Sequence, residues 1–331
     1  MAPALALSLF GCCLVVTLAA AATFARRLDR LGARFGLPEV LVGLLTAAAA
    51  DGPEVTSALA ALVKGAREAS VGVIVGSNVF NLAAMVGLSA LLAGSVRVRR
   101  ETLVVEGSVA LVVTAVVIAL LAGGLSALVS VVLLGCVLIP YLVLVVAGRR
   151  LATRASVFSR LEAAAGGAVG DVGQRGGAHA GVDFATYRQV SLMAVDLLLI
   201  VGGSVGMVQS ALSLGDRWGV RPALVGVLVL APLTSLPNAL TGVRLGLAGR
   251  GSALVSEVLN SNTINLVVGI AVPALFVTLT AHSRTDSRDL VLLAVMTVAA
   301  LALLAPPVGV RRLGGVTLLL VYVVFVAVQL V

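Results

Sequence analysis

The chain has 331 residues, of which 60% are hydrophobic and only 11% are charged, and its mean hydropathy is +1.14. These values lie far outside the range of soluble domains, so the composition predicts an integral membrane protein whose main partner is lipid. The formal net charge of +8 does not indicate a nucleic-acid partner, because the basic residues lie in short gaps between apolar runs, where they indicate orientation in the membrane instead.

Ten apolar segments are long enough to cross a bilayer, which takes about 20 residues. No basic region precedes the first, so we expect a retained span and not a cleaved signal peptide. The predicted spans cover residues 4–25, 37–63, 70–94, 102–122, 125–147, 189–212, 220–248, 253–280, 289–305 and 309–331.

The longest polar stretch, residues 148–188, divides these spans five and five, and its Gly, Ala and Arg content is typical of a mobile linker. If the ten spans are right, 17 of the 23 Lys and Arg residues lie on the linker's side of the membrane. This excess predicts a multi-pass protein of the cell membrane with a cytoplasmic linker and extracytoplasmic termini. We therefore expect a first five-helix repeat at 1–147, a linker at 148–188 and a second repeat at 189–331.

An internal repeat relates the halves at an offset of 184 residues: Pro53-Glu54 aligns with Pro237-Asn238, and G-S-N-V-F-N-L from residue 76 aligns with N-S-N-T-I-N-L from residue 260. Because each half has an odd number of spans, the second half must enter the membrane from the opposite side. The sequence predicts an all-α membrane protein of ten transmembrane helices in two inverted five-helix repeats, a common architecture of secondary transporters.

The second and seventh predicted spans are interrupted near their middles, the second by Gly52 and Pro53 and the seventh by Pro232 and Pro237. Such breaks free backbone carbonyls, which are tolerated at membrane depth where they are buried in protein or line a wet cavity. Carbonyls, hydroxyls and carboxylates are the oxygen ligands that hard cations such as sodium and calcium prefer.

Two acids flank the first break. Asp51 and Glu54 are about one helical turn apart, so they point in similar directions if helical geometry persists. A carboxylate inside a membrane is costly and by default indicates a functional site. Two carboxylates held together away from water would be ready to exchange a proton for a metal ion. The alternative, an extramembrane turn, is less favoured because apolar sequence continues on both sides.

Polar pairs recur beside the breaks. Ser77 and Asn81 are spaced i, i+4, as are Ser261 and Asn265, so each pair lies on one helix face. Such residues can simply join helices through hydrogen bonds, and for a single pair that explanation would be preferred. Since the pair occurs twice, each time after a broken span, we favour a polar site near the middle of the membrane.

These motifs resemble those of the cation/calcium antiporter superfamily, the sodium/calcium exchanger group, of which the chain would be a divergent member. That family has two inverted repeats, each with a G-T-S-x-P-E break followed by a G-S-N-x-x-N helix. Here the first repeat has A-A-D-G-P-E at 49–54 and G-S-N-V-F-N at 76–81, and the second has L-T-S-L-P-N at 233–238 and N-S-N-T-I-N at 260–265.

The resemblance implies a secondary antiporter that moves sodium, calcium or protons by alternating access, with inorganic cations as its ligands and no cofactor, and it is compatible with a monomer. Glu54 matches the family's central cation-binding glutamate. The implied cation-binding set comprises main-chain oxygens of Ala47 and Ala231 and the side chains of Asp51, Glu54, Ser77, Asn81, Thr234, Ser235, Asn238, Ser261 and Asn265, with Asp51 and Glu54 as the charged metal ligands.

The chain departs from the family pattern at three of these positions. Asn238 replaces a glutamate, Asp51 replaces a serine, and Asn265 stands where many exchangers have an aspartate. Both predicted carboxylates therefore come from the first half. Cation binding stays plausible, but protons or sodium become more credible substrates than calcium, because Asn238 offers only a neutral oxygen.

Three other acids are left outside the predicted site. Glu257 precedes Asn262 by five residues, which turns its direction by about 140°; it could replace a missing acid, but we favour an interfacial or packing role. Asp196 and Glu106 lie near span ends, where snorkelling or ion pairing would explain them.

Two rival functions remain. Residues 202–206 form G-x-S-x-G, which elsewhere marks a nucleophile, so an intramembrane serine hydrolase is one rival. It would need a base, and the only histidines, His179 and His282, lie in predicted loops, so we expect Gly202 and Gly206 to allow close helix packing instead. The other rival is a non-transporting, exchanger-like sensor or scaffold. No G-x-x-x-x-G-K loop for ATP is present, so an ion gradient should drive transport.

Overall fold

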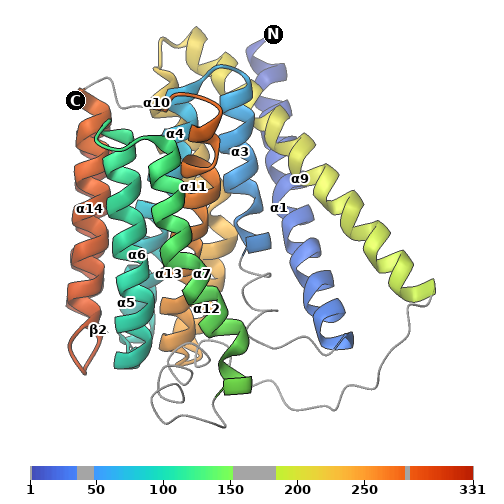
Figure 1. Ribbon diagram of the computed structural model, residues 1–331. Coiled ribbons are helices and arrows are strands. Elements are labelled where there is room, and N and C mark those ends of the chain that lie inside the picture. Colours follow the sequence, from blue (N-terminus) through green and yellow to red (C-terminus); the bar gives the residue numbers. More distant parts are fainter. Residues whose placement is uncertain (1, 36–47, 152–183, 280–283, 331) are drawn as a thin grey trace.

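The computed structural model describes residues 2–35, 48–151, 184–279 and 284–330, which form a helical bundle with one pair of two-residue strands (Figure 1). The elements of the first half are α1 (Pro3–Arg34), α3 (Gly52–Val63), α4 (Arg67–Asn81), the π-helical segment η1 (Leu82–Leu88), α5 (Ser89–Ala93), β1 (Ser95–Val96), α6 (Arg100–Leu121) and α7 (Ala127–Leu151).

The second half follows the same plan. Its elements are α9 (Phe184–Arg217), α10 (Pro222–Leu224), the π-helical segment η2 (Val225–Leu230), α11 (Ala231–Thr234), α12 (Leu236–Leu247), α13 (Gly251–Leu266), the π-helical segment η3 (Val267–Ala271), the 3-10 turn η4 (Pro273–Leu275), α14 (Arg284–Leu304), β2 (Val310–Arg311) and α15 (Arg312–Leu330).

The helix boundaries repeat at the offset found in the sequence. α3 and α12 are both 12 residues long, and they begin at Gly52 and Leu236, 184 residues apart. α4 and α13 begin at Arg67 and Gly251, again 184 apart, and each continues into a π-helical segment. The internal repeat is therefore a repeat of structural elements.

Seven helices in the described part of the chain are long and apolar enough to cross a membrane, and the bent pair Pro222–Thr234 and Leu236–Leu247 makes an eighth. The expected count of ten is not reached in this form. α3 is shorter than a span because it covers only the part of the second predicted span that follows the break at Gly52. Most of the part before the break, residues 37–47, lies outside the described residues. Large apolar side chains are exposed on outer helices, among them Leu128 of α7 and Leu198 of α9, as expected of surfaces that face lipid.

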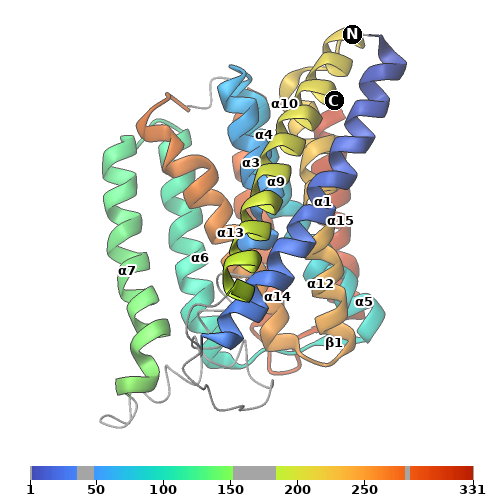
Figure 2. The same ribbon diagram turned by 90° about the vertical axis from the view of Figure 1, so that its right-hand side faces the viewer.

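α4 and α13 lie in the centre of the bundle. In the span Arg67–Ala93, which comprises α4, η1 and α5, 83% of the most apolar stretch is buried inside the protein, against 17% in the α7 span, which lies at the edge (Figure 2). Because lipid contacts only the outer helices, polar side chains on the inner pair are shielded from both lipid and water. Any intramembrane polar site is therefore expected on α4, α13 and the elements that touch them.

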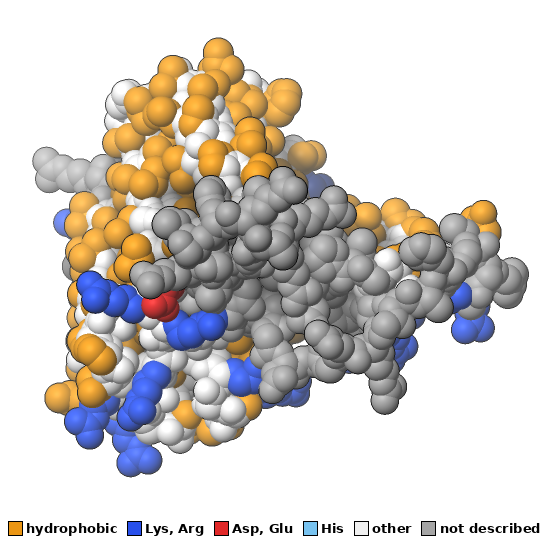
Figure 3. Space-filling view, turned by 60° about the horizontal axis from the view of Figure 1, so that its bottom comes forward, with side chains coloured by type: hydrophobic (Ala, Val, Ile, Leu, Met, Phe, Trp, Pro, Cys, Tyr) orange, Lys and Arg blue, Asp and Glu red, His pale blue; other side chains and the backbone are white. Residues whose placement is uncertain are grey.

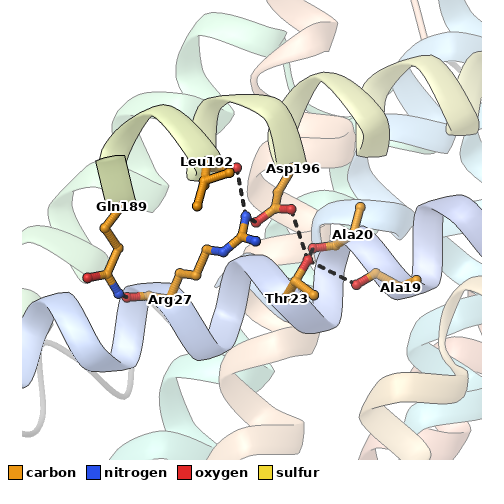
Figure 4. Close-up of polar contacts among 7 residues, drawn as sticks. All are labelled: Ala19, Ala20, Thr23, Arg27, Gln189, Leu192 and Asp196. Atoms are coloured by element: carbon orange, nitrogen blue, oxygen red, sulfur yellow. Dashed lines mark hydrogen bonds and ion pairs between the residues drawn. The ribbon is translucent and has the colours of Figure 1, made fainter. Parts of the chain in front are cut away.

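The first helices of the two halves, α1 and α9, lie side by side and run in opposite directions (Figures 1 and 2). Arg27 of α1 donates to the Asp196 carboxylate at 2.5 Å and to the Leu192 carbonyl at 2.9 Å, and Thr23 also donates to Asp196 at 2.9 Å (Figure 4). The expected ion pairing of Asp196 is confirmed. Opposite directions for two equivalent helices agree with an inverted arrangement of the halves.

Glycines of the G-x-S-x-G segment bring α9 close to α1. A Cβ at Gly206 would lie 2.5 Å from Cys13 Sγ, and a Cβ at Gly203 would lie 2.2 Å from Thr17 Oγ1, whereas a Cβ at Gly202 would meet nothing within 4 Å. The packing role expected of Gly206 is confirmed, and that of Gly202 is wrong. Gly203 takes this role because it faces α1, while Gly202 is turned away from α1.

Exposed arginines gather at the end of the bundle where β1 pairs with β2 (Figure 3). We call this the basic end. Its members are Arg97, Arg99, Arg100, Arg250, Arg311 and Arg312. α13 also begins at this end. Its first residue, Gly251, packs against the Arg97 backbone, and a Cβ at Gly251 would lie 2.1 Å from the Arg97 carbonyl oxygen.

Replacing Gly203 with valine should force α1 and α9 apart, because the new side chain would overlap Thr17. We expect the free energy of unfolding to fall by about 1–3 kcal/mol, as for other overpacked contacts. Thermal unfolding of the detergent-purified protein measures this. Gly202→Val is the matched control, since it adds the same side chain where space is open. Equal destabilisation by both substitutions would contradict the assignment and point to helix propensity alone.

Candidate functional site

The two helix breaks have nearly the same backbone geometry. Asp51 precedes α3 with φ −76° and ψ −7°, and Ser235 joins α11 to α12 with φ −84° and ψ −1°. A proline follows two residues later in each case, at the start of a helix, where its missing N–H is not needed. α11 and α12 are bent by 46°. The interruptions predicted from the prolines are confirmed.

Glu54, in the first turn of α3, is completely buried, and its carboxylate accepts hydrogen bonds from three side chains of the second half. Ser235 and Asn238 donate to Oε1, the latter at 3.2 Å, and Asn265 of α13 donates to Oε2. The Glu54 carboxylate is thus held by three parts of the second half: the break between α11 and α12, the helix α12 and the inner helix α13.

Asp51 lies beside Glu54 and is also buried. Its Oδ1 accepts a hydrogen bond from Ser261 at 2.6 Å and one from Asn238 at 2.8 Å. The Asn238 amide therefore bridges the two carboxylates. A carboxylate at this position would offer no donor and would add a third negative charge, so the amide is the chemically suited group for a site whose charges both come from the first half.

Three oxygens of this cluster are buried without a hydrogen-bond partner: Asp51 Oδ2, Asn81 Oδ1 and Asn265 Oδ1. All three are acceptors, and leaving a buried acceptor unsatisfied costs about 1–3 kcal/mol. A bound cation or proton would satisfy them. Their chemistry fits a hard cation, which prefers oxygen ligands. No group of three or more His, Cys, Asp or Glu side chains in the described ranges is arranged to hold a metal, so the cluster depends on neutral oxygens.

The remaining predicted residues are buried nearby, and most make their hydrogen bonds within their own helix. Ser77 donates to the Ile74 carbonyl at 3.1 Å, and Thr234 donates to the carbonyls of Leu230 at 2.9 Å and Ala231 at 3.2 Å. Their hydroxyl oxygens can still accept.

The main-chain oxygen predicted at Ala231 also accepts from the Ser235 N–H at 3.1 Å, so it is already engaged by the backbone. Asn81 donates to Ser261 at 3.3 Å and thereby joins the cluster. Ala47 lies outside the described residues.

One polar contact between the inner helices was not predicted from the sequence. Asn78 donates to the Asn262 carbonyl at 3.1 Å, and Asn262 donates back to the Asn78 carbonyl at 3.2 Å, so α4 and α13 are joined by a reciprocal pair 184 residues apart. The signal was present, because both residues recur identically at the repeat offset.

Two other polar groups proved separate from the cluster. Glu106 is buried and accepts a hydrogen bond from Ser256 of α13, so the snorkelling suggested for it is wrong: its side chain points inward, toward α13. Ser204 is buried and shares a 2.7 Å hydrogen bond with Thr56 of α3. This hydroxyl pair joins α9 to α3, and both histidines that a hydrolase would need lie outside the described residues.

Two related halves that bury a cluster of carboxylate, amide and hydroxyl oxygens between inner helices are typical of membrane transport proteins for small ions. The sequence model of the sodium/calcium exchanger protein family matches residues 5–147 and 189–331, which are both halves, and the chain therefore belongs to this family. Members of this family are transporters and not enzymes, so the serine hydrolase hypothesis is wrong.

Individual relatives agree with this assignment. Inner membrane protein YrbG of Escherichia coli (strain K12) is 31% identical over 110 residues, which are 33% of this chain and 34% of that protein. The match thus spans about a third of the length of this curated relative.

Solved structures share the fold. The structure of native YfkE has a TM-score of 0.66 at 15% identity and covers 97% of this chain and 92% of its own. The sodium-calcium exchanger NCX_Mj, soaked with 10 mM Na+ and zero Ca2+, has a TM-score of 0.58 at 19% identity and covers 98% of this chain and 99% of its own. A crystal of the same exchanger with 100 mM Na+ and 10 mM Sr2+ gives a TM-score of 0.60. At these identities the likeness concerns the fold.

Replacing Asn78 with alanine should weaken the contact between α4 and α13, because the substitution leaves the Asn262 carbonyl buried without its donor. We expect the free energy of unfolding to fall by about 1–3 kcal/mol, measured by thermal unfolding in detergent. Ser70→Ala is the control on the same helix: Ser70 is buried, but its hydroxyl has no partner, so its loss should be neutral. Equal stability of Asn78→Ala and the wild type would show that the reciprocal pair contributes nothing.

Proposed function

We propose that this protein is a secondary cation antiporter in which two inverted five-helix repeats, residues 1–147 and 189–331, alternately expose one central site to the two sides of the membrane. The observation that carries the proposal is the pair of buried carboxylates of the first half, Asp51 and Glu54, held by donors of the second half beside unsatisfied acceptor oxygens.

The position of the donors supports alternating access. Ser235 and Asn238 lie on the second half's break and short helix, and Ser261 lies on its inner helix, so a movement of one half against the other would change how the carboxylates are held. A cation or proton that binds Asp51 or Glu54 offsets the negative charge that these donors stabilise, so it weakens their hydrogen bonds to the carboxylates. Binding and rearrangement are then coupled through the same hydrogen bonds.

We propose sodium and protons as the favoured substrates, with calcium as the weaker alternative. The site supplies two negative charges, Asp51 and Glu54, while Asn238 and Asn265 contribute neutral groups. Calcium takes 6–8 oxygen ligands, usually with several carboxylates on different sides. Two adjacent carboxylates from one half suit the competitive binding of a sodium ion and a proton better.

The basic end supports the orientation proposed for the protein. Arginines concentrated on one end of a membrane bundle favour the cytoplasmic side. In Figure 1 both termini lie at the other end, which supports extracytoplasmic termini. The segment 148–188 would then connect the two repeats on the cytoplasmic side.

Flux into proteoliposomes under sodium, calcium and proton gradients tests the proposal. Glu54→Gln and Asp51→Asn should each lower cation exchange at least about tenfold, the equivalent of one charge-assisted contact worth 1.4 kcal/mol. Glu106→Gln, which changes a buried acid outside the site, should transport like the wild type. Unchanged flux in Glu54→Gln would show that the site is elsewhere. A wild-type protein without any flux, and without cation-dependent stability, would be a sensor or scaffold instead.

The distribution of charge is also testable. The double substitution Asp51→Ser with Asn238→Glu keeps two carboxylates but takes one from each half. We expect the ratio of calcium to sodium transport to rise about tenfold, because a divalent ion would then have carboxylates on opposite sides. Parallel uptake of radioactive calcium and sodium measures the ratio, and a ratio like that of the wild type would contradict the role given to Asn238.

A further inference from the structure

Glu257 lies in the same row of α13 as two residues of the cluster. Glu257, Ser261 and Asn265 are spaced i, i+4 and i+8, and four residues of an α-helix turn by about 400°, so successive members of the row differ by only about 40°. The comparison with Asn262 placed Glu257 away from the site, but Ser261 and Asn265 are the α13 residues that contact the carboxylates. Glu257 is therefore one turn, about 6 Å, before Ser261 on the same side of the helix.

Glu257 precedes Ser261 by about one turn of α13, and the Ser261 hydroxyl donates to Asp51 Oδ1 at 2.6 Å, so Glu257 lies toward the face of α13 that meets Asp51. Among the described residues, no hydrogen bond or ion pair holds the Glu257 carboxylate. Asp51 in turn uses only Oδ1 for its two hydrogen bonds, and its buried Oδ2 has no partner. Glu257 and Asp51 thus each have a carboxylate oxygen without a hydrogen-bond donor, and a cation bound between two neighbouring carboxylates would offset their mutual repulsion.

The internal repeat argues against a packing role. The position equivalent to Glu257 in the first half is Val73, which is completely buried. An apolar side chain therefore meets the packing requirement of this position in the repeated fold. Packing alone does not explain the acid that the second half has there. Glu257 is also part-exposed, whereas Asp51 and Glu54 are sealed, and it lies on the side of the cluster nearer the start of α13 at the basic end.

We propose that Glu257 and Asp51 form a second cation position, beside the central site at Glu54, that takes a monovalent hard cation of the sodium type. Asp51 is shared by the two positions, so an ion can pass between the basic end and the central site while keeping a carboxylate ligand. The limited number of oxygens fits a monovalent ion better than calcium, which needs 6–8 ligands. This inference rests on the proposed function, since it adds a position to the same site.

Equilibrium binding of radioactive sodium to the full-length protein in detergent tests this directly. The wild type should bind two sodium ions per chain, and Glu257→Gln should bind one, with the affinity of the remaining ion changed by less than about threefold. Glu106→Gln is the matched control: it removes a buried acid that is bonded to Ser256, the neighbour of Glu257 on α13, and should still bind two ions. Glu257→Asp keeps the carboxylate and should bind two ions with lower affinity.

The outcomes separate this inference from the proposed function. One sodium ion in the wild type, or two in Glu257→Gln, would overturn the second position and leave the central site standing. No sodium binding in the wild type would overturn both. Because the number of ions bound by the wild type is itself diagnostic, the test stands even if Glu257→Gln does not fold. A Glu257→Gln protein that folds, binds one ion and exchanges cations with an about tenfold higher half-saturating concentration would support the inference.

Discussion

Two carboxylates buried side by side are the constraint on which this structure depends. Asp51 and Glu54 repel each other, and burying either without partners would cost several kcal/mol. The second half supplies these partners from its break, its short helix and its inner helix. The contact between the halves therefore consists in part of the candidate site, so a substitution in this cluster changes both the packing of the halves and the groups offered to a ligand.

Duplication has produced chemical complementarity at this contact. At the repeat offset Asp51 corresponds to Ser235 and Glu54 to Asn238, so an acceptor in the first half stands against a donor in the second at both positions. The backbone has kept its symmetry, since Asp51 and Ser235 share one conformation. The side chains have lost it. A symmetric scaffold can thus hold an asymmetric charge distribution, because only the side chains at the breaks need to differ.

Much of this arrangement could be predicted from the sequence, because it depends on residues with unusual backbone or solvation properties. Prolines located the breaks, and intramembrane acids and a repeated Ser/Asn pattern located the site. The rotation of each helix about its own axis could not be predicted. In lipid, apolar residues cover the outer and inner faces alike, so no polar stripe shows which face is inside. Hence the sequence favours Gly202 over Gly203 as the packing glycine and places Glu106 at the surface. It also gives no sign that Ser261, and not Asn262, is the relevant neighbour of Glu257.

The reciprocal pair of Asn78 and Asn262 has a consequence for the proposed alternating-access cycle. Each residue gives and receives the same amide-to-carbonyl bond, so interchanging the conformations of the two halves leaves the pair as it was. If the two halves exchange conformations between the inward-open and outward-open states, the Asn78–Asn262 contact can persist in both states. The pair would then act as a fixed pivot near the pseudo-twofold axis, about which the outer helices move while α4 and α13 stay together.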